Sequence, residues 1–338
     1  MERKPFTVPA AVCTIIVTLS ILITISVIFP HDMVRVNQIQ PNVTYLDAPP
    51  VPVSHSFNFQ NDTITVSMLI NRSVYEGAKE TDKRVFTFAG VPYATWAGES
   101  ARKMIEDPVL DEFYHDLLFQ FRTIREEKNL TDDEYAELLA SYAQSFRYET
   151  KGLPAKFPVE TVSDGYGDCD DFSFLLAGLL SREGYKTALF FFESDNHVVA
   201  GIGSNENQYL DTEYAYVDIM DYSFIGVTVN ELKGSDSMYL DPIVIPVGRG
   251  MKIYHSGNET RNIADIARLA YTRSGDLSTR MKEMRQDPAF NLAEYDRIAG
   301  ESSQYSRIYT YIIRHRFDRP GTYAYLQREM GFSGPENL

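Results

Sequence analysis

The sequence is poor in cysteine. Only Cys13 and Cys169 occur among 338 residues, and Cys13 lies in a long apolar run near the N-terminus. Cys169 therefore has no partner for a disulfide bond within its own chain, whereas exported domains often pair their cysteines. A single leftover thiol indicates either inert burial or chemistry.

The chain also lacks an excess of basic residues. It holds 32 Lys and Arg against 47 Asp and Glu, which gives a net charge of −15. Too few Lys and Arg are available to neutralise phosphates, so the composition argues against a nucleic-acid partner. Residues 261–338 differ from the rest, with 12 Lys and Arg against 10 Asp and Glu.

Charged residues are missing altogether from residues 5–30. The segment from Val8 to Phe29 would span roughly 33 Å as a helix, which is enough to cross a bilayer. Arg3 and Lys4 precede it, so the positive-inside rule places the N-terminus in the cytoplasm and the rest of the chain outside. The run is too long for a signal peptide and no A-x-A-like site follows it. The sequence therefore predicts a single-pass anchor in the cell membrane.

N-x-[ST] sequons follow the predicted anchor, and each is a possible glycosylation site on an exported domain. Their asparagines are Asn42, Asn61, Asn71, Asn129 and Asn258. All five lie on the side of the anchor that is predicted to face outward, which is consistent with an extracytoplasmic domain.

The pattern along the chain predicts four regions. They are a cytoplasmic tip with the anchor (residues 1–30), an extracytoplasmic stalk with short strands (31–95), a catalytic domain (96–260) and a mainly helical C-terminal region (261–338). The stalk is rich in proline and polar residues at its start, and its strand-like runs are 62–70 and 84–88.

Helical patterns dominate the first half of the catalytic domain. Apolar residues at helical spacing predict one helix, through Leu110, Phe113, Tyr114, Leu117, Leu118 and Phe121. Thr131 and Glu134 form a capping-box pattern at the start of the next helix. A third helix is predicted directly after Cys169. Strand-like runs at 186–193, 197–203 and 208–214 follow, so the order predicts an α+β fold with an antiparallel sheet.

Cys169 lies at the first turn of the third predicted helix, where unpaired N–H groups and the helix dipole stabilise a thiolate. The neighbouring aspartates oppose this by raising the thiol pKa, so activation needs a nearby base. His197 begins a predicted strand and Asp211 lies in the next one. A base that is oriented by a third group is the arrangement of a nucleophilic triad.

Strand pairing restricts this triad. In an antiparallel pair of strands, the numbers of two directly opposite residues always add up to the same value, the pairing sum. Two residues on the two strands share a face of the sheet only when their own sum is odd or even as the pairing sum is. His197 and Asp211 sum to an even number, so the hairpin that joins them needs a loop with an odd number of residues, or a bulge.

The stretches "GDCDDFSFLLAGLLSREGY", "HVVAGI" and "YLDTEY" resemble the transglutaminase-like superfamily of papain-type Cys-His-Asp proteins. The resemblance spans roughly residues 100–230. It implies a core of helices packed on an antiparallel sheet, with Cys169, His197 and Asp211 as the catalytic residues. The sequence departs from the family where an aromatic residue often follows the histidine and a proline follows the aspartate, since "HVV" and Thr212 stand there.

The resemblance also implies a side chain upstream of the cysteine that donates a hydrogen bond to the oxyanion. Gln144 is the candidate, because it lies opposite the apolar stripe of its helix and so faces either solvent or a cleft. Trp96, the only tryptophan, is the second choice.

Three aspartates, Asp168, Asp170 and Asp171, surround the cysteine. Calcium prefers clustered carboxylates, and similar periplasmic proteases carry acids beside the cysteine. The stretch "DCDD" lacks a full calcium-loop pattern, and acids are favourable at any helix start. The ligands of a metal therefore stay unknown, and no other cofactor is expected.

These features predict a membrane-anchored, outward-facing thiol hydrolase that cleaves peptide or amide bonds of a protein or peptide substrate at the cell surface. An amine-transferring, cross-linking transglutaminase shares the first half-reaction and is an alternative. A non-catalytic surface scaffold that retains the fold is a further one.

Overall fold

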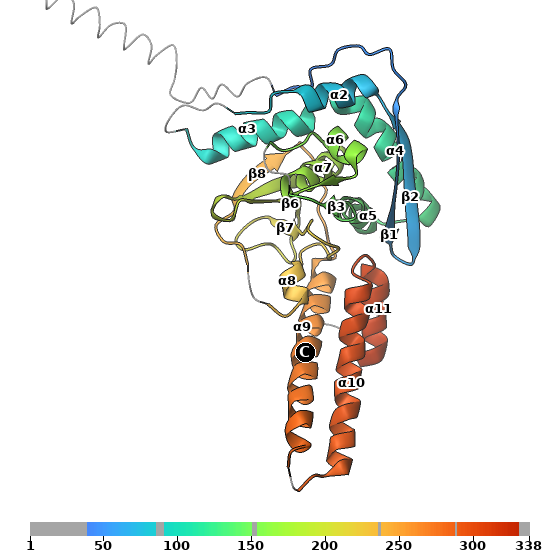
Figure 1. The fold of residues 1–338 in the computed structure, drawn as a ribbon, viewed down its shortest axis with the longest axis vertical. Coiled ribbons are helices and arrows are strands. Elements are labelled where there is room, and N and C mark those ends of the chain that lie inside the picture. Colours follow the sequence, from blue (N-terminus) through green and yellow to red (C-terminus); the bar gives the residue numbers. More distant parts are fainter. Residues whose placement is uncertain (1–38, 86–90, 151–153, 236–237, 288, 331–338) are drawn as a thin grey trace, which may run out of the picture.

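The computed structural model describes residues 39–85, 91–150, 154–235, 238–287 and 289–330. Helices and small, mainly antiparallel sheets are mixed, which confirms the α+β class (Figure 1). Within these ranges no helix is long and apolar enough to cross a membrane. The predicted anchor, Val8 to Phe29, lies outside the described residues.

A four-stranded antiparallel sheet forms the centre of the body, in the order β7-β6-β5-β8. Its strands are β5 (Thr187–Phe192), β6 (His197–Gly203), β7 (Tyr214–Val217) and β8 (Ile243–Val247). β5 has neighbours on both edges and apolar contacts on both faces, which is why "TALFFF" is buried throughout. Two of the three predicted strands are confirmed, whereas residues 208–213 form a turn and the third strand begins only at Tyr214.

The two faces of this sheet are covered differently. Val198, Ala200 and Ile202 of β6 join the main core on the side of α7 (Cys169–Arg182). On the opposite face, Val199 belongs to a separate aromatic cluster with Phe190, Phe192, Tyr209, Tyr214 and Tyr216. This alternation is the period of two expected for a strand that is covered on both sides.

Helices pack around α7. They are α3 (Tyr93–Glu106), α4 (Asp111–Lys128), α5 (Asp132–Gln144) and α6 (Pro158–Asp164), and the 3-10 turn η1 (Pro108–Leu110) joins α3 to α4. α4 buries Phe113, Tyr114, Leu117, Leu118 and Phe121, as the apolar spacing predicts. The predicted capping box of α5 is also confirmed, since Glu134 N–H donates to Thr131 Oγ1 and Thr131 N–H to the Glu134 carboxylate.

Much of the predicted stalk is built into the body instead. β1 (Val51–Phe59) and β2 (Asp62–Ile70) form an antiparallel hairpin, and α2 (Arg72–Glu80) follows. Phe57, Phe59 and Val66 are buried in the same core as α4 and α5. The strand at 62–70 is confirmed, whereas the run 84–88 lies partly outside the described residues and Arg84 and Val85 form no strand.

Short elements complete the body. β3 (Arg147–Tyr148) pairs in parallel with β4 (Tyr166–Gly167) directly before α7. The 3-10 turn η2 (Glu193–Asp195) joins β5 to β6, and α8 (Val229–Leu232) lies between β7 and β8.

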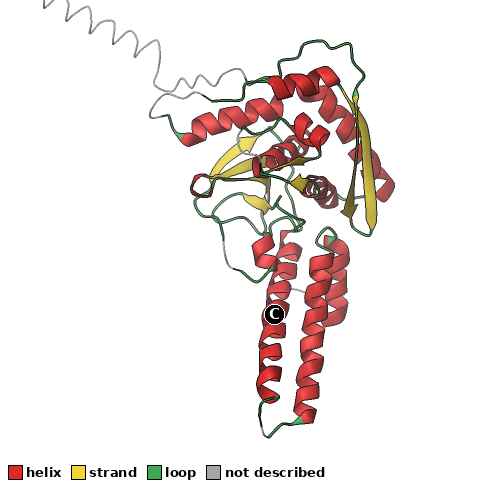
Figure 2. Ribbon diagram, viewed as in Figure 1, coloured by secondary structure: helices red, strands yellow, loops and turns green. Residues whose placement is uncertain are grey.

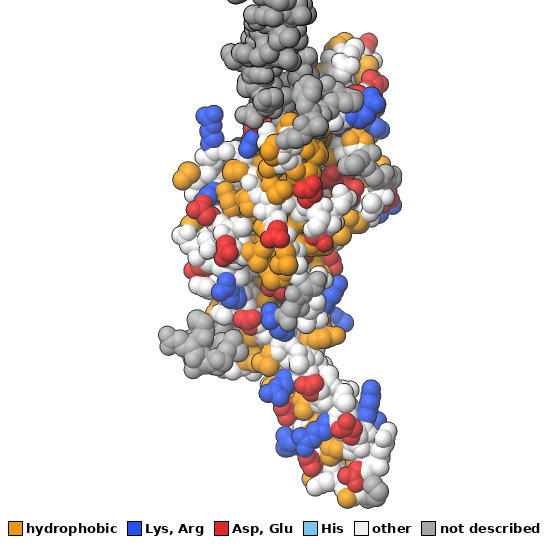
Figure 3. Space-filling model, turned by 90° about the vertical axis from the view of Figure 1, so that its left-hand side faces the viewer, with side chains coloured by type: hydrophobic (Ala, Val, Ile, Leu, Met, Phe, Trp, Pro, Cys, Tyr) orange, Lys and Arg blue, Asp and Glu red, His pale blue; other side chains and the backbone are white. Residues whose placement is uncertain are grey.

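The C-terminal region is helical, as predicted. α9 (Gly257–Met284) and α10 (Leu292–Arg314) form a long antiparallel hairpin that projects from the body, and α11 (Arg319–Met330) lies beside them (Figure 2). Side chains of both charge signs are interspersed on this projection, whereas apolar side chains gather on the face of the body above it (Figure 3). α9 buries no residue beyond Ala270, so its distal half is mostly exposed.

Candidate active site

Cys169 is the first residue of α7, with Asp168 as the N-cap. Its thiol is free and only partly buried. Burial nevertheless raises the pKa of the thiol to about 11, and the charges of Asp170 and Asp168 act in the same direction. Backbone N–H groups of Val198 and Asp170 lower this pKa but do not outweigh the lost hydration. The thiolate that a helix start favours is therefore not the resting form at neutral pH.

His197 is the first residue of β6 and is buried. Its Nε2 lies 3.3 Å from the Tyr216 hydroxyl, and its ring lies 4.5 Å from the Tyr239 ring between centroids. Within the described part of the chain, Nδ1 has no hydrogen-bond partner. Burial lowers the pKa of His197 to about 4, against a smaller opposing effect of Asp195. The resting imidazole is therefore neutral.

The structure brings the thiol and the start of β6 together. The Val198 N–H interacts with the Cys169 thiol, and Ser173, one turn further along α7, donates from Oγ to the Val198 carbonyl at 3.0 Å. Burial raises the pKa of both phenols beside His197, those of Tyr216 and Tyr239, and a charged Cys169 thiol would add a smaller effect in the same direction. Cys169 thus lies against the residue that follows His197, whereas the His197 ring turns toward the aromatic face of the sheet. Cys169, His197, Tyr216 and Tyr239 are called the cluster below.

Asp211 is not part of this cluster. β6 pairs Gly203 with Tyr214, so residues 204–213 form a ten-residue connection at the end of β6 away from His197. Asp211 is exposed in that connection. The hairpin therefore has neither the odd loop nor the bulge that would bring Asp211 to His197, and the aspartate of the predicted triad is corrected on this ground.

The register instead selects Tyr216 and Asp218. Ala200 pairs with Val217, so the pairing sum is odd and even-numbered residues near the end of β7 share the face of His197. Asp218 follows β7, is buried, and accepts hydrogen bonds from the N–H groups of Met220 (3.0 Å) and Val229 (2.8 Å). Burial raises the pKa of Tyr216, and the charge of Asp218 acts in the same direction. The aromatic and β-branched run "YAYV" is the sequence signal for this strand, and the prediction of a strand at 208–214 missed it.

The amide of Gln144, the predicted oxyanion donor, is engaged elsewhere in the structure. It is the last residue of α5, it is buried, and its Nε2 donates to the carbonyls of Asp218 (2.7 Å) and Ser223 (3.0 Å). Because an amide nitrogen has two N–H groups, both are already used. Trp96 packs edge-to-face on Tyr93 within α3, and Tyr93 packs on Phe191 of the sheet.

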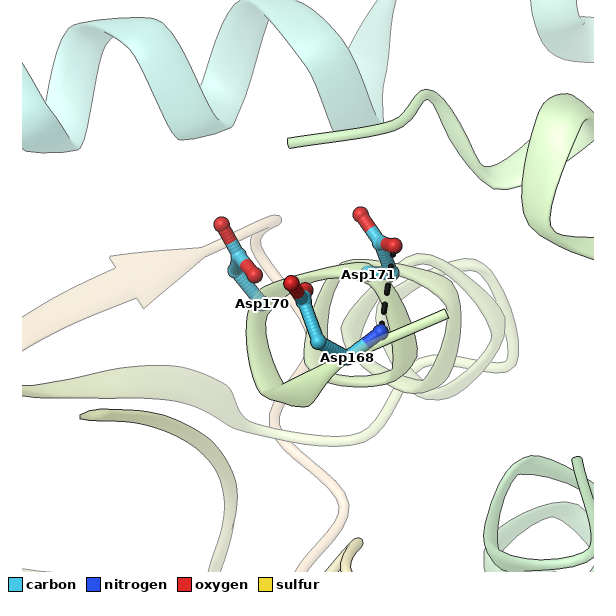
Figure 4. Close-up of side chains that lie close together, drawn as sticks. All are labelled: Asp168, Asp170 and Asp171. Carbon is cyan, nitrogen blue, oxygen red and sulfur yellow. Dashed lines mark hydrogen bonds between the residues drawn. The ribbon is translucent and has the colours of Figure 1, made fainter. Parts of the chain in front are cut away.

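Asp168, Asp170 and Asp171 bring carboxylate oxygens within 4.8 Å of one another, a spacing that a metal ion could occupy (Figure 4). Asp171 accepts the N–H groups of Lys156 at 2.6 Å and of Asp168 at 3.2 Å, so it fastens the turn before α7. Burial raises the pKa of Asp170 well above its ordinary value, helped by a hydrogen bond to Asp168. These contacts fit acids that start a helix, and calcium binding stays a prediction.

Chemically, the cluster offers a nucleophile, a base and a phenol that orients the base. Cys169 supplies the thiol, His197 offers Nδ1, and Tyr216 fixes Nε2. Burial raises the pKa of Tyr148, and a charged Cys169 thiol would raise the Tyr148 pKa further. The Tyr148 side chain is partly exposed. Comparison with protein family models, with curated proteins and with solved structures finds no match to this chain.

Proposed function

We propose that this protein is a thiol hydrolase that cleaves peptide or amide bonds, with Cys169 as nucleophile and His197 as base. One observation carries the proposal. The backbone at the start of β6 contacts the Cys169 thiol at the start of α7, while the Tyr216 hydroxyl lies within hydrogen-bond distance of Nε2 of His197. Nδ1 is then the nitrogen left to accept the thiol proton. The likeness of the sequence around these residues to papain-type proteins supports the same assignment.

In the proposed reaction, the imidazole begins with its proton on Nε2, which donates to the Tyr216 oxygen. Nδ1 takes the proton from Cys169 as the sulfur bonds to the substrate carbonyl carbon. The imidazolium then returns this proton to the leaving amine as the carbon–nitrogen bond breaks. Water releases the acyl group from sulfur in the second half-reaction.

Both partners start neutral in this scheme. A thiol pKa of about 11 and an imidazole pKa of about 4 disfavour a resting ion pair. Proton transfer therefore accompanies the attack on the carbonyl rather than preceding it. The N–H of Cys169 is at the helix start, where backbone donors have no partner within the helix, and it is the donor proposed for the oxyanion.

The location is proposed to be the outer side of the cell membrane, with the segment Val8 to Phe29 as the anchor. The sequon asparagines support an outward-facing body, because Asn42, Asn61, Asn71, Asn129 and Asn258 are all exposed. A buried sequon could not receive a glycan on the folded protein.

The test uses the full chain in detergent with fluorescein-labelled casein and, in parallel, casein with dansylcadaverine. New small fragments are expected, and Cys169→Ser should abolish them. His197→Gln should slow their release by about 10²–10⁴-fold. Asp211→Asn is the matched control and should cleave at the wild-type rate, because Asp211 is exposed and outside the cluster.

Other outcomes identify the alternatives. Cys169-dependent incorporation of dansylcadaverine without fragments would replace the hydrolase with a transglutaminase. Neither product, in protein whose melting transition is intact, would favour the non-catalytic scaffold.

A further inference from the structure

The C-terminal helices reach the loop that carries Asp218. The acid loop, residues 218–223, follows β7, and the corner between α10 and α11 is residues 315–318. Arg316 Nη1 donates to Asp221 Oδ2 at 2.7 Å, and the Tyr222 and Phe317 rings pack edge-to-face at 5.4 Å between centroids. In Figure 1 this corner lies at the end of the projection nearest the body.

The body holds the acid loop from the other side. Gln144 of α5 donates to the carbonyls of Asp218 and Ser223, and so clamps both ends of the loop. Within the loop, Met220 N–H donates to the Asp218 carboxylate. The position of Asp218 beside Tyr216 therefore depends on two clamps, α5 and the corner.

The corner is itself fixed to the body. Arg319, at the start of α11, donates from Nε to Glu137 of α5 at 2.5 Å and from Nη1 to Glu259 of α9. Gln60, in the turn between β1 and β2, donates its N–H to the Phe317 carbonyl at 3.0 Å. Because α5 carries both Glu137 and Gln144, one rigid helix sets the spacing between the two clamps.

We propose that Arg316 is a positioning residue for the site: through Asp221 it fixes the acid loop, and with it Asp218 beside Tyr216, the partner of His197. This gives the C-terminal helices a role in the reaction, and it rests on the proposed function. The Arg316 side chain is only 18% exposed, whereas that of Asp221 is 47% exposed, so Arg316 is the more buried member of the pair.

The test measures the rate of Cys169 alkylation by iodoacetamide between pH 7 and pH 12, a range that includes the thiol pKa of about 11, using the full chain in detergent. Arg316→Gln should loosen the acid loop, admit water to the cluster and move the alkylation midpoint to lower pH by about half a unit or more, because burial is what raises it. Arg316→Lys keeps the positive charge beside Asp221, so its midpoint should stay close to that of the wild type. Arg314→Gln, an exposed arginine two residues earlier, is the matched control and should not shift the midpoint.

The pairing with Asp221 is tested by Asp221→Asn and by the double variant. The double variant should shift the midpoint no further than either single change, and additive shifts would overturn the route through Asp221. Equal midpoints for wild type and Arg316→Gln, with a lowered melting temperature, would leave Arg316 only structural and overturn the proposal. The proposed function is tested separately by His197→Gln. If this variant leaves the alkylation profile unchanged, the proposed function fails, whatever the Arg316 variants show.

Discussion

Burial holds the two reacting side chains in their neutral forms. Isolated on a helix start, Cys169 would have a lowered pKa, but the lost hydration raises it to about 11. His197 is affected in the opposite direction, to about 4, because the imidazolium is the form that loses hydration. Asp170 and Asp168 reinforce the shift of the Cys169 pKa, whereas Asp195 opposes the shift of the His197 pKa only in part.

The histidine makes stability depend on pH. Its folded-state pKa of about 4 lies below the ordinary value of 6.5, so the unfolded chain binds the proton first as pH falls. Stability should therefore decline between pH 6.5 and pH 4, by up to about 3 kcal/mol, and this contribution should be constant above and below that window. Urea unfolding of wild type and His197→Gln at pH 4, 5, 6 and 7 measures the difference.

His197→Gln is the reference, because the other titrating groups are the same in this variant and in the wild type. The gap between the two stability curves should close or change sign as pH falls. Parallel curves would mean that His197 is hydrated, against the burial described here.

At the scale of elements, α7 is held at a close approach to α4. Gly178 lies where a side chain would overlap the hydroxyl of Tyr114, which is fully buried. The guanidinium of Arg182 lies 3.7 Å from the centroid of the Tyr114 ring. Because α7 begins with Cys169, this contact also sets the position of the thiol.

Gly178→Ala should destabilise the protein by about 1–3 kcal/mol, because the added methyl group overpacks the contact between α4 and α7. Gly300→Ala is the matched control: a methyl group at Gly300 in α10 meets no atom within 4 Å, so it should stabilise by about 0.5–1 kcal/mol. Thermal unfolding of the two variants beside wild type gives both signs. Similar effects at both positions would contradict the close packing of α7.

At the scale of the molecule, a buried ion network joins the C-terminal helices to the body. Arg319 connects α5, α9 and α11 through Glu137 and Glu259, and the Tyr254 hydroxyl also donates to Glu137 at 2.7 Å. Burial raises the pKa of Glu137 to about 7 even with Arg319 beside it. The network therefore links the docking of these helices to the protonation of one carboxyl group.

Arg319→Met should destabilise the protein by about 3 kcal/mol at pH 8, because it leaves the Glu137 carboxylate buried without its cation. The loss should be smaller at pH 5, where Glu137 is already protonated in the folded state. Adding Glu137→Gln should recover part of the stability at pH 8 and little at pH 5. Chemical denaturation at the two pH values measures all three proteins, and a pH-independent loss would exclude Glu137 as the cause.

The sequence alone determined the local elements. The spacing of Phe113, Leu117 and Phe121 predicts α4, and Thr131 with Glu134 predicts the start of α5. The run 197–203 coincides with β6, and Cys169 opens its helix as expected. These features depend on side-chain periodicity and capping between residues close in the chain, which a single sequence contains.

The tertiary structure decided the partners. A ten-residue connection between β6 and β7 sets the pairing sum, and this sum brings Tyr216 and Asp218, rather than Asp211, to the face of His197. The packing of α5 against the body also turns Gln144 inward, where its amide holds the acid loop. Pairing register and burial arise from contacts between distant segments, and a two-residue periodicity identifies a strand without fixing which residue of its neighbour lies opposite.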